Sequence, residues 1–252
     1  MNQGKILILY DNEVYDEVKD KGLINHWGLS LHIEFNRRKI LFDTGQTPDI
    51  LENNIKKLKV KIKNVDYLII SHYHYDHVGG LKKIIDLNPK IKVFLPEPLF
   101  EEEKKFAEEI KTQYPSIEFK FAKVKKLHKI EDSIYLYPAE ALKLTEQGLI
   151  LKLGEKQIVI VTGCAHWGVG KYVRELKQLE EFKDSKIELL IGGFHLTGKL
   201  SDEVKRTGEL LLIENVKKIC PLHCSGEHTK KIFTKMWKDN YIKGGAGALI
   251  TI

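Results

Sequence analysis

The sequence predicts an α/β protein built as a four-layer αββα sandwich, in which two sheets pack face to face between outer helices. Short strand-like runs that end in a polar motif are each followed by a segment with apolar residues at helical spacing. This succession occurs in the first half of the chain and again in the second. No linker stands out in the 252 residues, and a chain of this length can bury an ample core, so we expect one domain over residues 1–252.

The first half begins with strands and then alternates strands with helices. The turn-like Asn36-Arg37-Arg38 separates two β-rich runs, which predicts a hairpin. The run at 65–70 has the pattern of a buried strand and leads directly into a cluster of histidines. In order, this half is predicted to contain strands at 6–10, 29–35 and 39–42, a helix at 48–58, a strand at 65–70, a helix at 78–87, a strand at 90–95 and a helix at 101–111.

The second half repeats this organisation after a less regular stretch. Residues 117–137 alternate short apolar pieces with Lys and Asp, which suggests edge strands or long loops. The turn Gly154-Glu155-Lys156 then joins two apolar runs in a second hairpin. The predicted elements are strands at 149–153 and 157–161, a helix at 169–182, a strand at 187–191, a helix at 201–213, a strand at 217–220, a helix at 227–237 and a strand at 248–252.

Charge and cysteine content restrict the class of partner. The net charge of +6 comes mostly from Lys scattered among acids, which favours a small anionic substrate such as a phosphorylated molecule. Nucleic acid is not expected, because no basic stripe with interleaved aromatics is present. The apolar run at 6–10 is too short for a signal peptide or membrane span, and the three cysteines form an odd set, so we expect a cytoplasmic protein with reduced thiols and no membrane partner. These patterns leave the oligomeric state open.

Histidines at strand ends are the main chemical signal. Six of the ten histidines follow predicted strands in four separate motifs: His72, His74, His77, His166, His195 and His223. Neutral imidazole is the commonest metal ligand, and the carboxylate of Asp76 adds charge that holds a divalent ion. In an extended segment, alternation sends His72, His74 and Asp76 to one side, and His77 can turn back where a helix begins. One hexapeptide can therefore supply two ligands to each of two adjacent metals.

The hexapeptide His72-Tyr73-His74-Tyr75-Asp76-His77 resembles the His-x-His-x-Asp-His signature of the metallo-β-lactamase superfamily, and the preceding Leu41-Phe42-Asp43-Thr44-Gly45 resembles its first motif. Further segments are similar to the branch that contains a pterin-dependent synthase of archaeal methanopterin biosynthesis and many uncharacterised relatives. They are His26-Trp27-Gly28-Leu29-Ser30, Phe42-Asp43-Thr44-Gly45-Gln46, Thr162-Gly163-Cys164-Ala165-His166, Gly192-Gly193-Phe194-His195-Leu196 and Pro221-Leu222-His223-Cys224-Ser225-Gly226. The resemblance spans nearly the whole chain.

The resemblance implies a ligand set and one or two divalent ions, zinc first, with manganese or iron as alternatives. It assigns one metal to His72, His74 and His166 and the other to Asp76, His77 and His223. It also implies that Asp43 orients the histidine loop without binding metal itself, as carboxylates behind ligating imidazoles do. A simple turn residue is the alternative interpretation of Asp43.

Cys164 is where the sequence departs from that pattern. Many hydrolases of the superfamily have an aspartate that bridges two metals at the place where this chain has Thr162-Gly163-Cys164. A thiolate can bridge or bind one metal, and a small buried side chain is the other interpretation. The number of metals therefore stays open at one or two.

Four other positions are candidates for substrate contact or catalysis. Gly192 and Gly193 permit close backbone approach, so His195 can contact substrate or protonate a leaving group; metal ligation in place of His166 and a structural role are alternatives. Ser225 begins a helix whose amides can hold an anion. His26 and Trp27 resemble residues at a cavity mouth, with ordinary packing as the alternative for Trp27. Cys220 and Cys224 flank His223 in a pattern that also suggests a structural zinc site, although packing of Cys224 against the site is preferred.

The leading hypothesis is a metal-dependent hydrolase that acts on an ester, phosphoester or amide-type bond of a small molecule. Asp76 both ligates and steers the attacking water, while His195 assists the leaving group. A pterin-dependent transferase is the alternative implied by resemblance. A non-catalytic metal-binding protein is disfavoured because structural zinc sites are closed, and a redox protein because His74 stands where an acidic ligand would be expected. His32, His128 and His228 have no motif around them.

Overall fold

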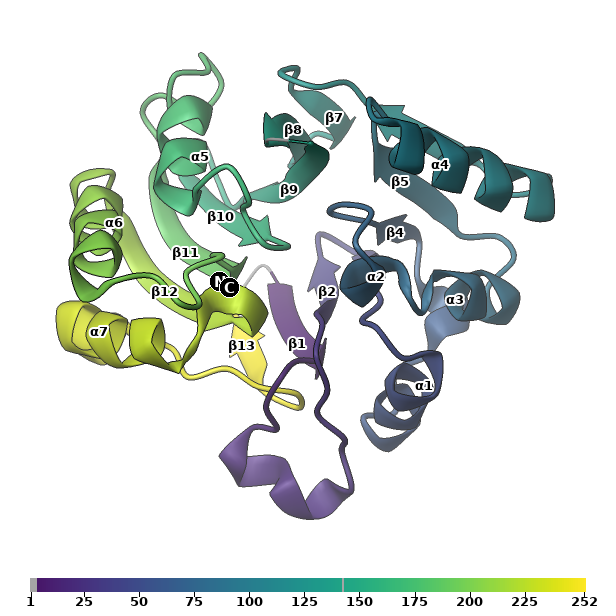
Figure 1. Cartoon of the computed structure of the whole chain (residues 1–252), viewed down its shortest axis with the longest axis horizontal. Helices are drawn as coiled ribbons and strands as arrows, with labels where there is room; N and C mark the ends of the chain where they lie inside the picture. Colours follow the sequence, from purple (N-terminus) through teal and green to yellow (C-terminus); the bar gives the residue numbers. More distant parts are fainter. Residues whose placement is uncertain (1–3, 142) are drawn as a thin grey trace.

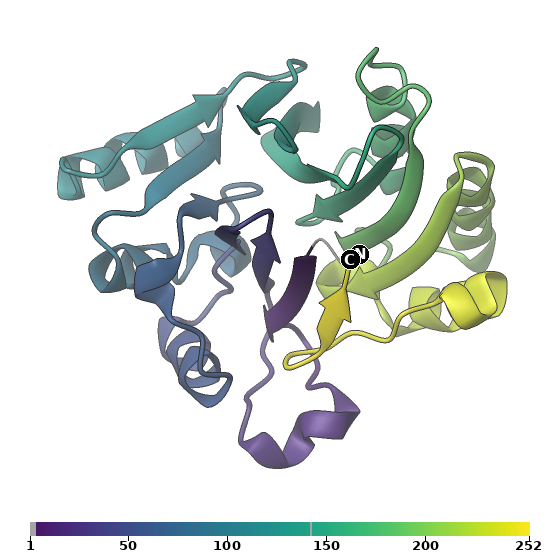
Figure 2. The same cartoon turned by 180° about the vertical axis from the view of Figure 1, so that it is seen from behind.

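The computed structural model, which describes residues 4–141 and 143–252, has two sheets packed face to face (Figures 1 and 2). The first sheet contains, in spatial order, β13 (Leu249–Thr251), β1 (Gly4–Tyr10), β2 (Ser30–Phe35), β3 (Arg38–Phe42), β4 (Tyr67–Ile69), β5 (Lys92–Pro96) and β6 (Phe119–Ala122). The second contains β12 (Val216–Leu222), β11 (Lys186–Gly193), β10 (Gln157–Thr162), β9 (Leu144–Lys152), β8 (Ile134–Ala141) and β7 (His128–Glu131).

Helices cover the outer face of each sheet (Figure 1). The first sheet is flanked by α1 (Pro48–Lys57), α2 (Tyr75–Val78), α3 (Leu81–Leu87) and α4 (Glu101–Gln113). The second is flanked by α5 (Val169–Leu176), α6 (Ser201–Ile213) and α7 (Glu227–Trp237). Short 3₁₀ turns lie at η1 (Asp16–Lys21), η2 (Ile62–Asn64), η3 (His223–Ser225) and η4 (Lys238–Asn240). No helix in the described part of the chain is long and apolar enough to cross a membrane.

Alternation along the strands produces the four layers. In β10, Val159 and Val161 belong to the core between the two sheets, whereas Ile158 and Ile160 pack under the helices of the second sheet. Successive side chains of a strand point to opposite faces, so a strand that is apolar throughout is covered on both sides. The predicted αββα sandwich is therefore confirmed.

The strand directions gather the polar motifs at one edge. Strands β3, β4 and β5 are parallel, and so are β10, β11 and β12. Parallel neighbours end at the same edge of a sheet, and the loops that leave this edge are where ligands bind in open α/β sheets. The histidine motifs follow β4, β10, β11 and β12.

The helices expected at 48–58 and 101–111 end one residue earlier and two residues later in the structure, and two other predicted helices differ more. The helix expected at 78–87 is two pieces, α2 and α3, because the chain turns at Gly79 and Gly80. A Cβ at Gly79 would lie 1.9 Å from the Gln46 carbonyl oxygen, so this turn packs directly on backbone. The helix expected at 169–182 ends at Leu176, and Phe182 packs into the core from the turns that follow.

The irregular stretch at 117–137 contains the edge strands that its composition suggests. Strands β6 and β7 lie at the edges of the first and second sheets. Strand β8 goes beyond that prediction, because it runs on to Ala141 and pairs with β9 inside the second sheet.

Candidate metal centre

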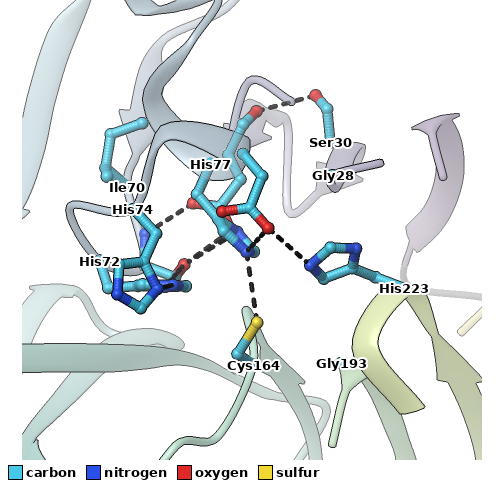
Figure 3. Close-up of polar contacts among 12 residues, drawn as sticks. Gly28, Ser30, Ile70, His72, His74, His77, Cys164, Gly193 and His223 are labelled. Carbon is cyan, nitrogen blue, oxygen red and sulfur yellow. Dashed lines mark hydrogen bonds and ion pairs between the residues drawn. The ribbon is translucent and has the colours of Figure 1, made fainter. Parts of the chain in front are cut away.

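Two groups of ligand-type side chains lie next to each other where loops from the two sheets meet. Figure 3 labels four of these residues, His72, His74, His77 and His223. In the first group, the ligand atoms of His72, His74 and His166 lie within 4.8 Å of one another. In the second, those of Asp76, His77 and His223 do the same. The structure thus brings together all six residues that the sequence proposed as metal ligands, in the two groups that the resemblance implied. Whether they bind metal stays a prediction.

The first group consists of imidazole nitrogens at close range. Nε2 of His72 lies 3.1 Å from Nδ1 of His74 and 3.3 Å from Nε2 of His166. Burial lowers the pKa of all three imidazoles, that of His166 to about 3. Neutral imidazoles with converging nitrogens are the form that binds a cation.

The second group is centred on Asp76. Its Oδ2 lies 3.1 Å from Nε2 of His223 and 3.8 Å from Nε2 of His77. Burial alone would raise the pKa of Asp76, but the nearby His223 and His77 imidazoles outweigh it, so the pKa is lowered and the carboxylate is ionised. The expected extended segment ends at His74, because α2 begins at Tyr75 and presents Asp76 and His77 from a helical turn.

Asp43 and Ser71 contact the Nδ1 atoms of the buried His77 and His72. Oδ2 of Asp43 accepts hydrogen bonds of 2.7 Å from Nδ1 of His77 and from the Ser71 hydroxyl. The same hydroxyl lies 2.8 Å from Nδ1 of His72. Burial lowers the pKa of His77, but the charge and hydrogen bond of Asp43 outweigh it and raise this pKa to about 9. Both rings are thereby held with Nε2 facing the centre.

Asp11 and Asn12 hold His223 in the same way, and sequence reasoning assigned them no role. Oδ1 of Asp11 accepts a 2.7 Å hydrogen bond from the His223 amide, and Oδ1 of Asn12 lies 3.0 Å from Nδ1 of His223. Both residues directly follow β1, so the strand-end position that marked the histidines also marked them.

Glu146 is a further contributor that the sequence did not reveal. It is 1% exposed within β9 and accepts hydrogen bonds of 2.7 Å from the backbone amides of Cys164, Ala165 and His166. Burial raises the pKa of Glu146 to about 7, against the lowering effect of these amides. This carboxylate fixes the loop that carries Cys164 and His166.

Cys164 lies between the two groups. Its Sγ is 3.3 Å from Nε2 of His77, and Figure 3 shows it below the His77 ring, with His223 on one side and His72 on the other. This position adjoins ligand atoms of both groups, and both interpretations of Cys164, ligand and small buried side chain, remain predictions.

His195 stands at the open side of the centre. It is exposed, its ring centroid lies 4.3 Å from that of His166, and a hydrogen bond with Cys224 raises its pKa. The adjacent glycines serve contacts within the chain, since a Cβ at Gly192 would lie 1.9 Å from the Thr162 carbonyl oxygen. Ser225 is fully buried, and its hydroxyl accepts a hydrogen bond from the Phe194 amide.

Trp27 and His26 lie close to the second group. The Trp27 ring is 42% exposed and packs at a centroid distance of 4.7 Å on the His223 ring. His26 is half-buried beside Tyr10, and its Nδ1 has no hydrogen-bond partner among the described residues. The remaining histidines, His32, His128 and His228, belong to none of the ligand groups within residues 4–141 and 143–252.

Four of the ten non-glycine residues with positive φ in the described part of the chain lie in the loops of this centre. Asp43, Ala165, His195 and His223 have φ between 46° and 58°, a region that costs non-glycine residues roughly 1–2 kcal/mol each. Such conformations persist only where the surroundings determine them, and they cluster at functional sites. Four strained loops that converge on one point indicate a site selected for its geometry.

The donor set fits a divalent cation. His72, His77 and His223 each have Nδ1 held by a partner, which leaves Nε2 facing the other ligand-type atoms of the centre. Nε2 of His223 is buried and has no hydrogen bond of proper geometry among the described residues, although the Asp76 carboxylate is near. A cation would satisfy these atoms together.

Comparison with known proteins places this geometry in a family context. The family model of the metallo-beta-lactamase superfamily matches residues 28–132. The chain is 29% identical to the 7,8-dihydropterin-6-methyl-4-(beta-D-ribofuranosyl)-aminobenzene-5'-phosphate synthase of Methanocaldococcus jannaschii, over 99% of each chain. It is 30% identical to an uncharacterised protein of the same organism, over 98% of this chain and 100% of that protein.

A solved structure described as a metal-dependent hydrolase of the beta-lactamase superfamily shares the fold. Its TM-score is 0.77, and 99% of both chains is covered at 21% sequence identity. At this identity the likeness shows a common architecture alone.

Proposed function

Because the chain belongs to the metallo-beta-lactamase superfamily, we propose that it is a metal-dependent hydrolase of a small molecule with an ester, phosphoester or amide-type bond. The net charge of +6 makes phosphorylated substrates the first class to test. Zinc is the first candidate metal, with manganese and iron as alternatives.

The observation that carries the proposal is the combination of two convergent ligand groups with an open side. Structural zinc sites are closed tetrahedra of Cys and His, whereas catalytic sites keep a position for water or substrate. Here a carboxylate and five imidazoles make up the two groups, and His74 and His195 are exposed at the edge of the centre. Water and substrate can therefore reach it.

The proposed mechanism divides the work among named residues. The chemistry that a divalent cation would supply here is Lewis acidity, which would lower the pKa of a water molecule and polarise the bond to be cleaved. His72, His74 and His166 would hold one cation, and Asp76, His77 and His223 a second. The ionised Asp76 carboxylate would also accept a hydrogen bond from the attacking water and so aim it. His195, exposed beside His166, would donate a proton to the leaving group.

The test is metal content and hydrolysis measured on the same preparations. Wild type, His74→Ala and His195→Ala are compared, with His228→Ala as the matched control because His228 is an exposed histidine outside the centre. Each is assayed on chromogenic phosphodiester, phosphomonoester, lactone and β-lactam substrates with zinc, manganese or iron restored. We expect His74→Ala to lose metal and activity, and His195→Ala to retain metal but lose roughly 10²–10⁴-fold in kcat.

The alternative function is group transfer, favoured by the similarity to the synthase over nearly the whole chain. Stoichiometric metal without hydrolysis of any substrate class would move the assignment to a transferase. A wild-type protein that binds no metal would refute both.

A further inference from the structure

Two cysteines that follow separate strands meet beside the centre. Cys164 follows β10 and Cys224 lies in η3 after β12, yet their Sγ atoms are 3.1 Å apart. Both side chains are nearly inaccessible, at 3% and 4% exposure. The proposed hydrolytic mechanism uses neither thiol, so the pair requires its own explanation.

The pair faces imidazoles and not an apolar core. Sγ of Cys164 lies within 4.8 Å of the ligand atoms of three sets: His72 with His77, His166 with His195, and His223 with Cys224. Its Sγ therefore lies near ligand atoms of both histidine groups. The third cysteine, Cys220, is fully buried in the apolar core between the sheets and takes part in none of these sets.

The surrounding backbone is built to bring the two sulfurs together. A Cβ at Gly193 would lie 2.7 Å from Sγ of Cys224 and 3.3 Å from Cα of Cys164, so only glycine leaves this space free. Figure 3 shows Gly193 beside Cys164 and His223. Glu146 holds the Cys164 amide, and the His195 amide donates to Sγ of Cys224 at 3.3 Å. Neighbouring backbone and side-chain groups therefore hold both thiols in place.

We propose that Cys164 and Cys224 form a dithiol ligand of the metal centre, which makes the centre selective for thiophilic divalent cations such as zinc, cobalt and cadmium over manganese and magnesium. The inference rests on the proposed function and specifies the metal that it uses. Soft thiolates favour these ions, whereas carboxylate and water ligands suit manganese and magnesium. Binding would release each thiol proton to solvent with no change in oxidation state.

The experiment replaces the native metal with cobalt in wild type, Cys164→Ser, Cys224→Ser and the matched control Cys220→Ser. Thiolate ligation produces an intense sulfur-to-cobalt charge-transfer band in the near ultraviolet, whereas imidazole and carboxylate ligands do not. We expect the band in wild type and Cys220→Ser, and a clear loss of intensity in each of the other two variants. The ratio of cadmium to manganese affinity should fall at least tenfold in Cys164→Ser and in Cys224→Ser.

The outcomes separate this inference from the proposed function. Cobalt bound with hydrolytic activity but without the band in wild type would overturn the dithiol and leave the hydrolase assignment standing. A band unchanged in Cys224→Ser would also overturn it, since only Cys164 would then ligate. Failure of wild type to bind cobalt would count against the proposed function as well. Circular dichroism shows whether each variant folds. If a variant does not fold, the wild-type spectrum alone still shows whether thiolates bind the cobalt ion.

Discussion

At the scale of single residues, the centre depends on groups that aim the imidazoles. Asp43 holds Nδ1 of His77, Ser71 holds His72, and Asn12 holds His223. A ring held at Nδ1 presents Nε2 with a fixed direction and tautomer, and loss of such a partner typically weakens metal affinity roughly 10–100-fold. These partners can therefore be tested by substitution in the same way as the proposed ligands.

The pair of Asp43 and His77 predicts how metal affinity varies with pH. In the metal-free protein the His77 pKa is about 9, so below that pH a proton occupies Nε2 and must leave before a cation binds. His77 should thus contribute a rise in affinity of about tenfold per pH unit that ends near pH 9, and any thiol proton released on binding adds to that slope. His72 and His166 add no slope there, because burial already keeps them neutral. Competition with a chromophoric chelator between pH 6 and 9 measures this.

Asp43→Asn provides the comparison. It removes the charge that raises the His77 pKa, so the rise of affinity with pH should flatten, and affinity near pH 9 should fall roughly 10–100-fold. Asp132→Asn, at an aspartate whose side chain is 99% exposed, should leave the pH profile unchanged. The same slope in Asp43→Asn as in wild type would contradict this account.

Glu146→Gln tests the carboxylate under the Cys164 loop. Three backbone amides donate hydrogen bonds to its two oxygens. The side-chain NH₂ group of glutamine would place a donor opposite at least one of these amide donors. A buried donor left unpaired costs about 1–3 kcal/mol, which lowers Tm by roughly 2–12 °C for a chain of this size. Metal affinity should fall too, because the loop also carries His166.

Glu140→Gln is the matched control for that variant, since Glu140 is exposed and pairs with Thr145, next to Glu146 in β9. Glu140→Gln should have the same Tm as wild type in differential scanning calorimetry and the same metal affinity in titration. A Tm for Glu146→Gln within about one degree of the control would contradict the role of Glu146 in positioning the Cys164 loop.

At the scale of elements, the sequence predicted the strand and helix succession because periodicity is a local property. The bounds expected for α6 and α7 agree with the structure, and the histidine motifs follow strands as expected. The helical placement of Asp76 was not predicted, since four residues are too few to show a period. Glu146 was missed for another reason: its three partners lie 18 to 20 residues away, and strand alternation cannot distinguish a buried acid from a surface one.

The end of β11 allows a prediction at this scale. Gly193→Ala would place a Cβ 2.3 Å from the Gly163 carbonyl oxygen as well as against Cys224, so β10 and β11 must separate or the loops must shift. Overpacking of this kind costs about 1–3 kcal/mol, or a Tm roughly 2–12 °C lower. Gly154→Ala, in the turn between β9 and β10 with nothing within 4 Å, should be neutral. Equal Tm values for the two variants would show that the loops at β11 yield without cost.

At the scale of the whole molecule, the centre joins the two sheets. His72, His74, Asp76 and His77 leave the first sheet after β4, whereas His166 and His223 leave the second after β10 and β12. Each proposed ion therefore takes ligands from both sheets and would act as a crosslink. The prediction that residues 1–252 form one domain can be tested by thermal unfolding, because a single domain unfolds in one cooperative transition.

Removal of metal with a chelator should lower Tm while leaving one transition. A ligand at about 1,000 times its Kd stabilises the folded state by about 4 kcal/mol, which corresponds to roughly 8–16 °C for a chain of this length. His223→Ala takes away the ligand that the second sheet gives to the Asp76 group, so its metal-dependent rise in Tm should be less than half that of wild type. His228→Ala, from the neighbouring α7, should retain the full rise.

If chelation shifted only one of two separate transitions, the sheets would unfold independently and the crosslink would be refuted. A full rise in His223→Ala would instead show that the ion is held within the first sheet alone.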